Sequence, residues 1–513
     1  MKEKICGYYL DSEQEKIVLD NSKNILVVAG AGSGKTLTIL GKINYLIKYK
    51  NIKPDEILCI SFTRDASNSL KEKIKKEFNK DITVYTFHKL SIELLKKMNI
   101  KFEITDVDTL SNIIHKFIYI DVLENPKFMK IILNILEEKY KNKKKYITYI
   151  DNNKQKVNKL ENLIETFIHL FKCNNHKLND FNKFLKTSKK NLFYQKEKIL
   201  LTIILNIYLE YQRYLNENNE IDFDDMITLA TKNLNNNLKL NYKYIIIDEY
   251  QDTSYVRFLL IKKLLELTNA NLLVVGDDFQ SIYRFTGCDL SLFIDFTKYF
   301  KNSKIMKIQN TYRNSLELIT VAGSFVMKNQ KQIRKTLNSN KKLDYPIEIV
   351  YYKNIKEDFY KLVSLIYNKT KKNILVLGRN NYDINMVLNP KYFKYNNNSI
   401  TCLKNYNIKI NYLTVHKSKG LEEENVIMIN LRNDILGFPC KIKNNQILRF
   451  VTNNKEKYLY SEERRLFYVG LTRTKNKVYL FTPLNKESIF VKELKKDYKK
   501  NIKINKIFLK WVV

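Results

Sequence analysis

The sequence predicts an α/β fold with two parallel-sheet domains in tandem and a helical insertion within the first. The prediction depends on where the apolar runs lie. Runs that suit buried strands alternate with helical segments over 24–90, and this alternation returns over 220–300. A second alternating set occupies about 301–482. Over 91–219 the strand pattern fades and Lys-rich amphipathic segments dominate, which is typical of helices.

These changes of pattern set the expected domain boundaries. The strand at 304–308 is expected to open the second domain, and the Asn- and Lys-rich stretches at 152–159 and 233–241 predict loops. The last residues are basic and suggest a helix followed by a short strand-like end. We expect a first sheet domain at 1–90 plus 220–300, a helical insertion at 91–219, a second sheet domain over 301–482, and a basic C-terminal tail at 483–513.

A strand-like run at 24–29 leads directly into a loop of small residues and then into a helix. Glycines let the backbone point its N–H groups at phosphate oxygens, and the helix start adds a partial positive charge. Lys35 can reach the terminal phosphates and Thr36 can hold Mg²⁺. The pattern predicts a nucleotide site, although alanine replaces its usual first glycine. The loop consists of Ala29, Gly30, Ala31, Gly32, Ser33, Gly34, Lys35 and Thr36.

Carboxylates follow two further apolar runs, at 244–247 and 272–275. Open parallel sheets bind ligands at such strand ends. ATP hydrolysis needs one carboxylate on Mg²⁺ and another group to activate or orient water. Adjacent carboxylates can divide these tasks, so we expect Asp248 to bind the metal and Glu249 to act on water.

The chain carries a net charge of +36, from 90 Lys and Arg against 54 Asp and Glu. This excess favours a polyanionic partner, nucleic acid first and a membrane surface second. A proteome biased toward Lys, Asn and Tyr would also produce it. The six cysteines are scattered without a C-x-x-C pair, which argues against zinc, iron–sulfur clusters and a disulfide framework. With neither a signal peptide nor an apolar run of membrane-spanning length, we expect a cytoplasmic protein, nucleoid-associated if bacterial.

Residues 275–285 read V-G-D-D-F-Q-S-I-Y-R-F. This motif is rarer in proteins than the phosphate-loop pattern. Together with A-G-A-G-S-G-K-T and the D-E-Y-Q-D-T run at 248–253, it resembles superfamily 1 DNA helicases of the UvrD/Rep type (SF1A). The resemblance covers about 8–482. Further matching motifs, in the order of that family, lie at 61–63, 86–88, 222–225, 311–315, 414–422 and 463–473.

The resemblance implies two RecA-like domains, 1A and 2A, with a 1B-like helical insertion in the first and ATP bound between them. It assigns adenine recognition to Gln14 and Tyr312, and a ribose contact to Glu422. Gly34, Lys35 and Thr36 would hold the phosphates and Mg²⁺. Asp248 would bind Mg²⁺, Glu249 would activate water, Gln280 would sense the γ-phosphate, and Arg313 and Arg473 would act as arginine fingers.

Single-stranded DNA binding is expected to use basic groups for phosphates and aromatic faces for bases. The residues in matching motifs are Phe62, His88, Phe285, His416 and Lys419. Phe62 and Phe285 could equally be core residues.

Some positions depart from the family. Asp11 replaces its usual asparagine, and Leu37 stands where many members have an arginine near adenine. Thr286 replaces the arginine that usually follows the aromatic residue at 285, so coupling between the DNA and ATP sites is expected to differ.

The largest departure is a length. Full-size members insert a whole 2B-type domain where this chain has only 381–413. The resemblance therefore implies a second sheet domain at 301–380 plus 414–482, with a vestigial 2B-type insertion at 381–413 that is absent or reduced to a loop. The leading hypothesis is an ATP-dependent 3′–5′ DNA helicase that acts on single strands and single-strand/duplex junctions in repair, replication or recombination, with proteins of those pathways as candidate partners. The first alternative is a translocase that displaces bound proteins but unwinds poorly. The second is a decayed motor that only binds nucleic acid or recruits partners, which the intact motifs disfavour.

Overall fold

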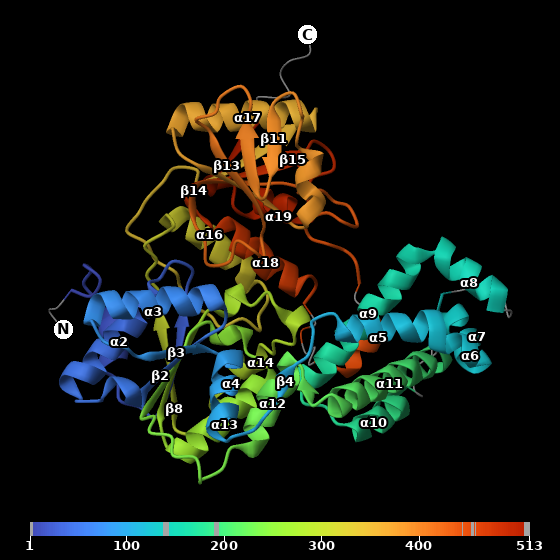
Figure 1. The fold of residues 1–513 in the computed structure, drawn as a ribbon. Helices are drawn as coiled ribbons and strands as arrows, with labels where there is room; N and C mark the ends of the chain where they lie inside the picture. Colours follow the sequence, from blue (N-terminus) through green and yellow to red (C-terminus); the bar gives the residue numbers. More distant parts are fainter. Residues whose placement is uncertain are drawn as a thin grey trace.

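The computed structural model describes residues 4–136, 143–188, 194–443, 445–452, 456 and 458–506. Figure 1 shows a first sheet domain in blue to yellow, a second sheet domain in orange and red next to it, and a group of cyan and green helices that projects to one side. The expected fold class, with tandem parallel-sheet domains and a helical insertion, is confirmed.

The first sheet is parallel throughout. Its edge strand β8 was expected to open the second domain, but β8 pairs with β1 from Asn24 opposite Ser303 to Ala29 opposite Ile308. The first domain therefore extends past the expected boundary at 301. Across the sheet the strands are β3 (Thr83–Thr86), β2 (Ile57–Ser61), β6 (Tyr244–Ile247), β7 (Asn271–Gly276), β1 (Asn24–Ala29) and β8 (Ser303–Ile308).

Helices cover both faces of this sheet, because alternate side chains of each strand point to opposite faces. In β1, Ile25 and Val27 pack in the same cluster as α2, whereas Leu26 and Val28 pack in the cluster that holds α4 and α13. One face carries α1 (Ser12–Leu19), α2 (Lys35–Tyr49) and α3 (Arg64–Phe78); the other carries α4 (Phe87–Lys97), α12 (Phe223–Asn233), α13 (Tyr255–Thr268), α14 (Ser291–Ile294) and α15 (Phe296–Tyr299).

The helical insertion leaves and rejoins the first domain through the parallel pair β4 (Glu103–Ile104) and β5 (Glu220–Ile221). The loop expected at 152–159 is wrong over most of its length, because α9 begins at Lys154 and buries Val157. No helix in the described ranges is long and apolar enough to cross a membrane. The insertion consists of α5 (Thr109–Lys116), the π-helical η2 (Phe117–Asp121), α6 (Val122–Glu124), α7 (Pro126–Ile135), α8 (Lys143–Asn152), α9 (Lys154–Cys173), α10 (Leu178–Ser188) and α11 (Tyr194–Glu217).

The second sheet is parallel apart from the antiparallel pairs β11–β12 and β12–β13. Residues 381–413, where the 2B-type insertion was expected to be reduced to a loop, form η6 (Asn381–Met386) and these strands. Part of the expected basic tail also joins the sheet, since β16 pairs with β9; residues 507–513 lie outside the described residues. The order is β11 (Phe393–Asn396), β12 (Ser399–Cys402), β13 (Lys409–Thr414), β10 (Ile374–Gly378), β14 (Glu423–Met428), β15 (Thr474–Pro483), β9 (Ile347–Tyr352) and β16 (Ile502–Asn505), with helices α16 (Leu316–Met327), α17 (Ile355–Thr370), α18 (Ser461–Leu471) and α19 (Ile489–Asp497).

A segment of the second domain also reaches the helical insertion. The 3₁₀ helix η7 (Gln446–Phe450) lies between β14 and α18 in the chain. Ile447 and Val451 are buried within the apolar core of the insertion, and the Phe450 ring stacks on Phe184 with centroids 5.3 Å apart. We call this contact the η7 junction.

Candidate active site at the domain cleft

The phosphate loop connects β1 to α2, as the sequence predicts. Gly32 and Gly34 have φ angles of 69° and 78°, in the left-handed region that glycine tolerates best. A Cβ atom on Gly32 would lie 2.5 Å from Cβ of Arg313. The Tyr312 N–H donates to the Gly32 carbonyl at 2.9 Å. The loop is therefore in direct contact with the segment that leads into the second domain.

The paired carboxylates lie beside the loop lysine. Lys35 Nζ donates to Glu249 Oε1 at 2.6 Å. Burial and the adjacent Glu249 raise the pKa of Asp248 to about 6. Burial also opposes ionisation of Glu249, but the charges of Lys35 and Lys419 outweigh it and lower the Glu249 pKa below its ordinary value. Neighbouring carboxylates thus have separated pKa values, a common feature of sites that divide proton chemistry between two groups.

Gln280 of the first domain and Arg473 of the second are in contact where the two sheet domains face each other, and we call this boundary the cleft. Gln280 lies in η4 (Asp278–Gln280), where its amide nitrogen donates to Asp277 at 2.7 Å and its oxygen accepts from Arg473 Nη2 at 3.3 Å. Arg473 follows α18 and is 1% exposed. Burial, followed by the nearby charge of Arg313, lowers the pKa of Arg473 to about 9, which leaves it cationic at neutral pH. A buried cation of the second domain is therefore held against the first.

Gln14 and Tyr312 both lie near Gly34, which directly precedes α2. The Gln14 amide donates to the Ser33 carbonyl at 3.2 Å and accepts from the Asp11 N–H at 3.0 Å. The Tyr312 hydroxyl donates to Asp11 at 2.6 Å, and its ring, like the Gln14 amide, lies against Gly34. The Tyr312 side chain is 58% exposed. The structure therefore brings together the two side chains expected to contact adenine.

Arg313 and Glu422, expected at the phosphates and the ribose, are paired with each other. Arg313 Nε donates to Glu422 Oε2 at 2.6 Å, and Lys475 lies 2.9 Å from the other oxygen of that carboxylate. Arg313 therefore lies near the phosphate loop but directs its guanidinium at a carboxylate of the second domain.

Lys419 lies in this cleft as well, although the sequence placed it with the DNA-binding group. Its ammonium pairs with Asp252, lies 3.7 Å from Glu249, and donates to the Gln280 carbonyl at 2.9 Å. Its side chain is 8% exposed. The geometry therefore associates Lys419 with the carboxylates rather than with an open DNA surface.

Thr36 and Asp248 supply a hydroxyl and a carboxylate, which are ligand types that suit Mg²⁺. Thr36 is the second residue of α2, next to Lys35, and the Lys35 ammonium interacts electrostatically with Asp248. The Asp248 carboxylate accepts the Glu249 N–H at 2.9 Å through Oδ1. These donors fit a hard divalent cation.

Comparison with known protein families shows to which family the chain belongs. Residues 10–301 match the UvrD/REP helicase N-terminal domain, and residues 393–484 match the UvrD-like helicase C-terminal domain. The first match alone covers more than half of the chain. The chain belongs to the UvrD/Rep helicase family. The resemblance inferred from the motifs is thus confirmed.

Curated relatives of this UvrD/Rep family member are named as DNA helicases, and those named Rep and PcrA as ATP-dependent ones. The chain is similar to the ATP-dependent DNA helicase Rep of Buchnera aphidicola, with 31% identity over 387 residues, 72% of this chain and 54% of the relative. It is 26% identical to DNA helicase IV of Escherichia coli over 95% of this chain and 70% of the relative. It is 28% identical to PcrA of Bacillus subtilis over 68% of this chain and 43% of the relative. The chain spans about half the length of the Rep and PcrA relatives.

Aromatic side chains form a row beside the cleft of this UvrD/Rep family member. Phe62 stacks on Tyr283 with centroids 5.9 Å apart, and Phe285 lies 6.1 Å from Tyr283 and 5.7 Å from His416. Phe285 is 56% exposed. Tyr283, Phe285 and His416, but not Phe62, line a hollow with a volume of about 1140 Å³, which Arg379 and Tyr458 also line. The structure brings Phe62, Phe285 and His416 together, as expected for a base-stacking surface.

His88 lies apart from this row, against Phe223 at 5.3 Å. Burial, followed by the charge of Arg257, lowers the pKa of His88 to about 4. His88 is therefore a neutral side chain of the first domain, next to the helical insertion.

Two residues at the site, Tyr283 and Lys335, were not predicted from the sequence. Tyr283 connects the aromatic row, and its place inside the 275–285 motif was a usable signal. Lys335 is fully buried, with Nζ 2.5 Å from Asp277 and 2.8 Å from Asp278. Nothing local distinguishes Lys335 from the many other lysines, because its burial depends on tertiary packing.

Proposed function

We propose that this chain is an ATP-dependent DNA translocase and helicase that moves 3′ to 5′ on single-stranded DNA. The observation that carries the proposal is the contact of Arg473, from the second domain, with Gln280 of the first domain. The Gln280 carbonyl also accepts from Lys419, whose ammonium lies 3.7 Å from Glu249. The second domain's described residues contain no phosphate loop of their own. A site completed from both sides of a cleft couples nucleotide chemistry to domain movement.

In this proposal each residue of the cleft has one task. Gln14 and Tyr312 recognise adenine, the phosphate loop with Lys35 holds the phosphates, and Glu249 orients and deprotonates the attacking water. Thr36 and Asp248 would hold Mg²⁺, which would neutralise charge at the phosphates. Gln280 senses the γ-phosphate, while Arg473 and Arg313 stabilise the charge that develops on it.

Lys35 and Arg313 must change partners when ATP binds. Lys35 is paired with Glu249 and Arg313 with Glu422. Phosphate oxygens compete for both cations, so ATP binding frees Glu249 for water and draws Arg313 toward the phosphate loop. This exchange favours closure of the cleft, and loss of the γ-phosphate reverses it. Alternating grip by the two domains then produces steps along the strand.

The proposed DNA path crosses the aromatic row, where bases stack on Phe285 with Tyr283, Phe62 and His416 beside it. The net charge of +36 provides attraction for phosphates. We also propose that the chain acts on single-strand/duplex junctions in repair, replication or recombination.

Unwinding of 3′-tailed and 5′-tailed duplexes, compared in one assay with ATP and Mg²⁺, tests the proposal. We expect the purified chain to unwind the 3′-tailed substrate and to leave the 5′-tailed one intact. Preference for the 5′ tail would refute the polarity, and absence of ATP hydrolysis on either would refute the motor itself.

A second candidate is a translocase that strips proteins from single strands but unwinds poorly. It is favoured by 381–413, which form a short helix and strands of the second sheet and leave little chain for a 2B-type domain. ATP-driven displacement of streptavidin from a biotinylated single strand, together with weak unwinding of the 3′-tailed duplex, would support it. Efficient unwinding by the monomer would exclude it.

A further inference from the structure

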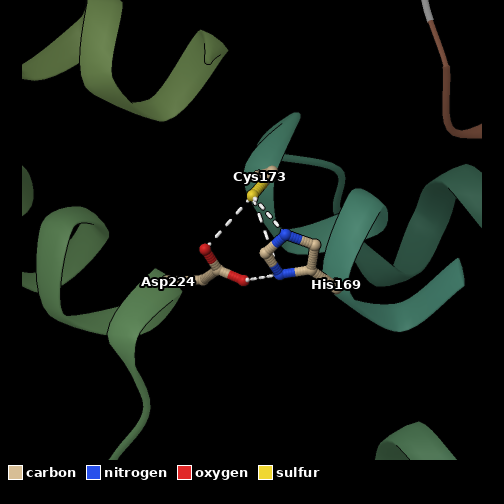
Figure 2. A group of neighbouring side chains, drawn as sticks. All are labelled: His169, Cys173 and Asp224. Atoms are coloured by element: carbon tan, nitrogen blue, oxygen red, sulfur yellow. Dashed lines mark hydrogen bonds and ion pairs between the residues drawn. The ribbon is translucent and has the colours of Figure 1, made fainter. Parts of the chain in front are cut away.

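A group of three metal-ligating side chains lies outside the cleft, where the helical insertion meets the first domain. His169 and Cys173 are four residues apart near the end of α9, so they share one face of the helix. Asp224 lies in the first turn of α12. Figure 2 shows the imidazole, the thiol and the carboxylate pointing toward one another from these two helices.

The donor atoms are close to the spacing of a tetrahedral zinc site. His169 Nδ1 lies 2.7 Å from Asp224 Oδ2, Cys173 Sγ lies 3.1 Å from Asp224 Oδ1, and Sγ lies 3.9 Å from His169 Nδ1. Zinc bond lengths place neighbouring ligand atoms roughly 3.3–3.8 Å apart. Small side-chain movements therefore make room for an ion in place of the shared protons.

The charged side chains around His169, Cys173 and Asp224 have other partners, so these three side chains remain free to bind a metal ion. The neighbouring carboxylates of Asp222 and Asp225 are both paired with Lys172, whereas Asp224 faces His169 and Cys173. The nearby cation Arg257 is directed elsewhere, since its guanidinium lies over the Phe62 ring and donates to the Asp252 carbonyl. One carboxylate and one thiolate would balance the charge of a divalent ion.

We propose that His169, Cys173 and Asp224 bind a zinc ion that pins the helical insertion to the first domain. The ligands are one imidazole nitrogen, the Cys173 thiolate and one carboxylate oxygen, with the fourth position filled by water or by the Thr286 carbonyl, which lies 3.8 Å from Sγ. The thiol proton and the proton between His169 and Asp224 pass to solvent. A thiolate selects zinc over Mg²⁺ or Ca²⁺.

The sequence argued against zinc because it has no C-x-x-C pair. That rule considers cysteine pairs alone. Here a His-x₃-Cys spacing on one helix is completed by Asp224, which lies 51 positions beyond Cys173 in the chain. Only the fold brings Asp224 to α9.

The proposed site would also support the aromatic row. A Cβ atom on Gly287 would lie 2.5 Å from Cβ of Cys173, so the backbone that follows Phe285 packs directly on the ligand. An ion that fixes Cys173 would therefore restrict the loop that presents Phe285. This restriction of the loop that presents Phe285 would not depend on ATP.

Zinc content and Co²⁺ spectroscopy of the full chain test the proposal. After dialysis against Zn²⁺ and removal of free metal, we expect one zinc per chain, and in the Co²⁺-loaded wild type a thiolate-to-metal charge-transfer band. Cys173→Ser and His169→Ala should each weaken Zn²⁺ binding by at least about tenfold. Chelation should lower the Tm of the wild type but not of these variants.

Matched controls separate this site from adventitious binding. Cys6→Ser removes an exposed thiol, His176→Ala removes the histidine just after α9, and Asp248→Asn alters the cleft; none should change zinc stoichiometry. Wild type without bound zinc, or without the Co²⁺ band, would overturn the proposal. So would equal zinc retention in wild type, Cys173→Ser and His169→Ala, which would leave the group as an ion pair beside a buried thiol.

Discussion

The contacts that the second domain makes with the first domain differ in composition from those that it makes with the helical insertion. At the cleft, charged and polar contacts such as Lys419 with Asp252 and Arg473 with Gln280 lie beside apolar packing. Phe279 and Ile282 of the first domain are buried there in the apolar core of the second domain. At the η7 junction the contacts are mainly apolar, with Ile447 and Val451 buried in the core of the helical insertion. Charged groups can exchange partners for a ligand, whereas buried apolar contacts are lost only when the surfaces separate.

This difference suggests that the two contacts have different tasks. The cleft holds unlike charges that phosphate can rearrange, so its geometry depends on the nucleotide. The described residues of the η7 junction include an ion pair, between Arg449 and Glu197 at 2.7 Å, beside the apolar contact. The junction would keep the helical insertion and the second domain together while the cleft opens and closes.

The largest expected effect is the loss of a cleft arginine. Arg473→Ala should lower the rate of DNA-stimulated ATP hydrolysis by roughly 10³- to 10⁵-fold, because the charge developing on the γ-phosphate loses its buried cation. ATP binding, measured with a fluorescent analogue, should change little. Arg449→Ala at the η7 junction is the control and should retain the wild-type rate; an equal loss of ATP hydrolysis in both variants would show that the cleft and the η7 junction do not differ in their role.

The second-largest effect is expected from the loss of apolar packing at the η7 junction. Ile447→Ala should cost about 2–4 kcal/mol of the free energy of unfolding, because it leaves a cavity in the core of the insertion. Thermal unfolding measures this cost. ATP hydrolysis per folded molecule, assayed well below the Tm, should stay near wild type. A collapse of hydrolysis in folded protein would show that the junction belongs to the catalytic machinery.

A smaller effect is expected at the aromatic row. Phe285→Ala should weaken single-stranded DNA binding by about 1–3 kcal/mol, the usual value of one stacked base. Fluorescence anisotropy with a labelled oligonucleotide reports the change. Tyr406→Ala, which alters an exposed aromatic of the second domain, should bind like the wild type. Unchanged binding by Phe285→Ala would exclude the row as the DNA path.

The smallest effect concerns pH. Burial, followed by the charges of Arg379 and Lys419, lowers the pKa of His416 to about 4, so His416 is neutral from pH 6 to 8 and gains charge only in acid. It therefore adds no phosphate attraction in the neutral range. The pH dependence of DNA binding over that range should be the same for His416→Gln and wild type. A binding gain toward pH 6 that disappears in His416→Gln would contradict this assignment.

Local chemistry explains what could be predicted. The phosphate loop, the strand-end carboxylates and the strands of the first sheet are encoded in contiguous runs, because strand, loop and helix signals lie within a few residues of one another. The family resemblance implied that Gln14 and Tyr312 contact adenine, and the fold brings them together at Gly34.

Tertiary packing explains what was missed. The strand β8 looks like any short apolar run, and only its pairing with β1 assigns it to the first sheet. The start of α9 is rich in Lys and Asn, yet Val157 and Leu160 bury against the insertion core and hold it helical. The positions of Lys335 and Lys419 depend on carboxylates that are distant in sequence, as does the approach of Asp224 to α9.

One measurement tests the central claim that the cleft is a DNA-driven ATP site. ATP hydrolysis is measured with and without single-stranded DNA for the wild type and for Lys35→Ala, which keeps the loop backbone but removes the phosphate-binding ammonium. The account predicts strong stimulation by DNA in the wild type and background hydrolysis in Lys35→Ala. Hydrolysis by Lys35→Ala at the wild-type rate, or no stimulation of folded wild type by DNA, would contradict it.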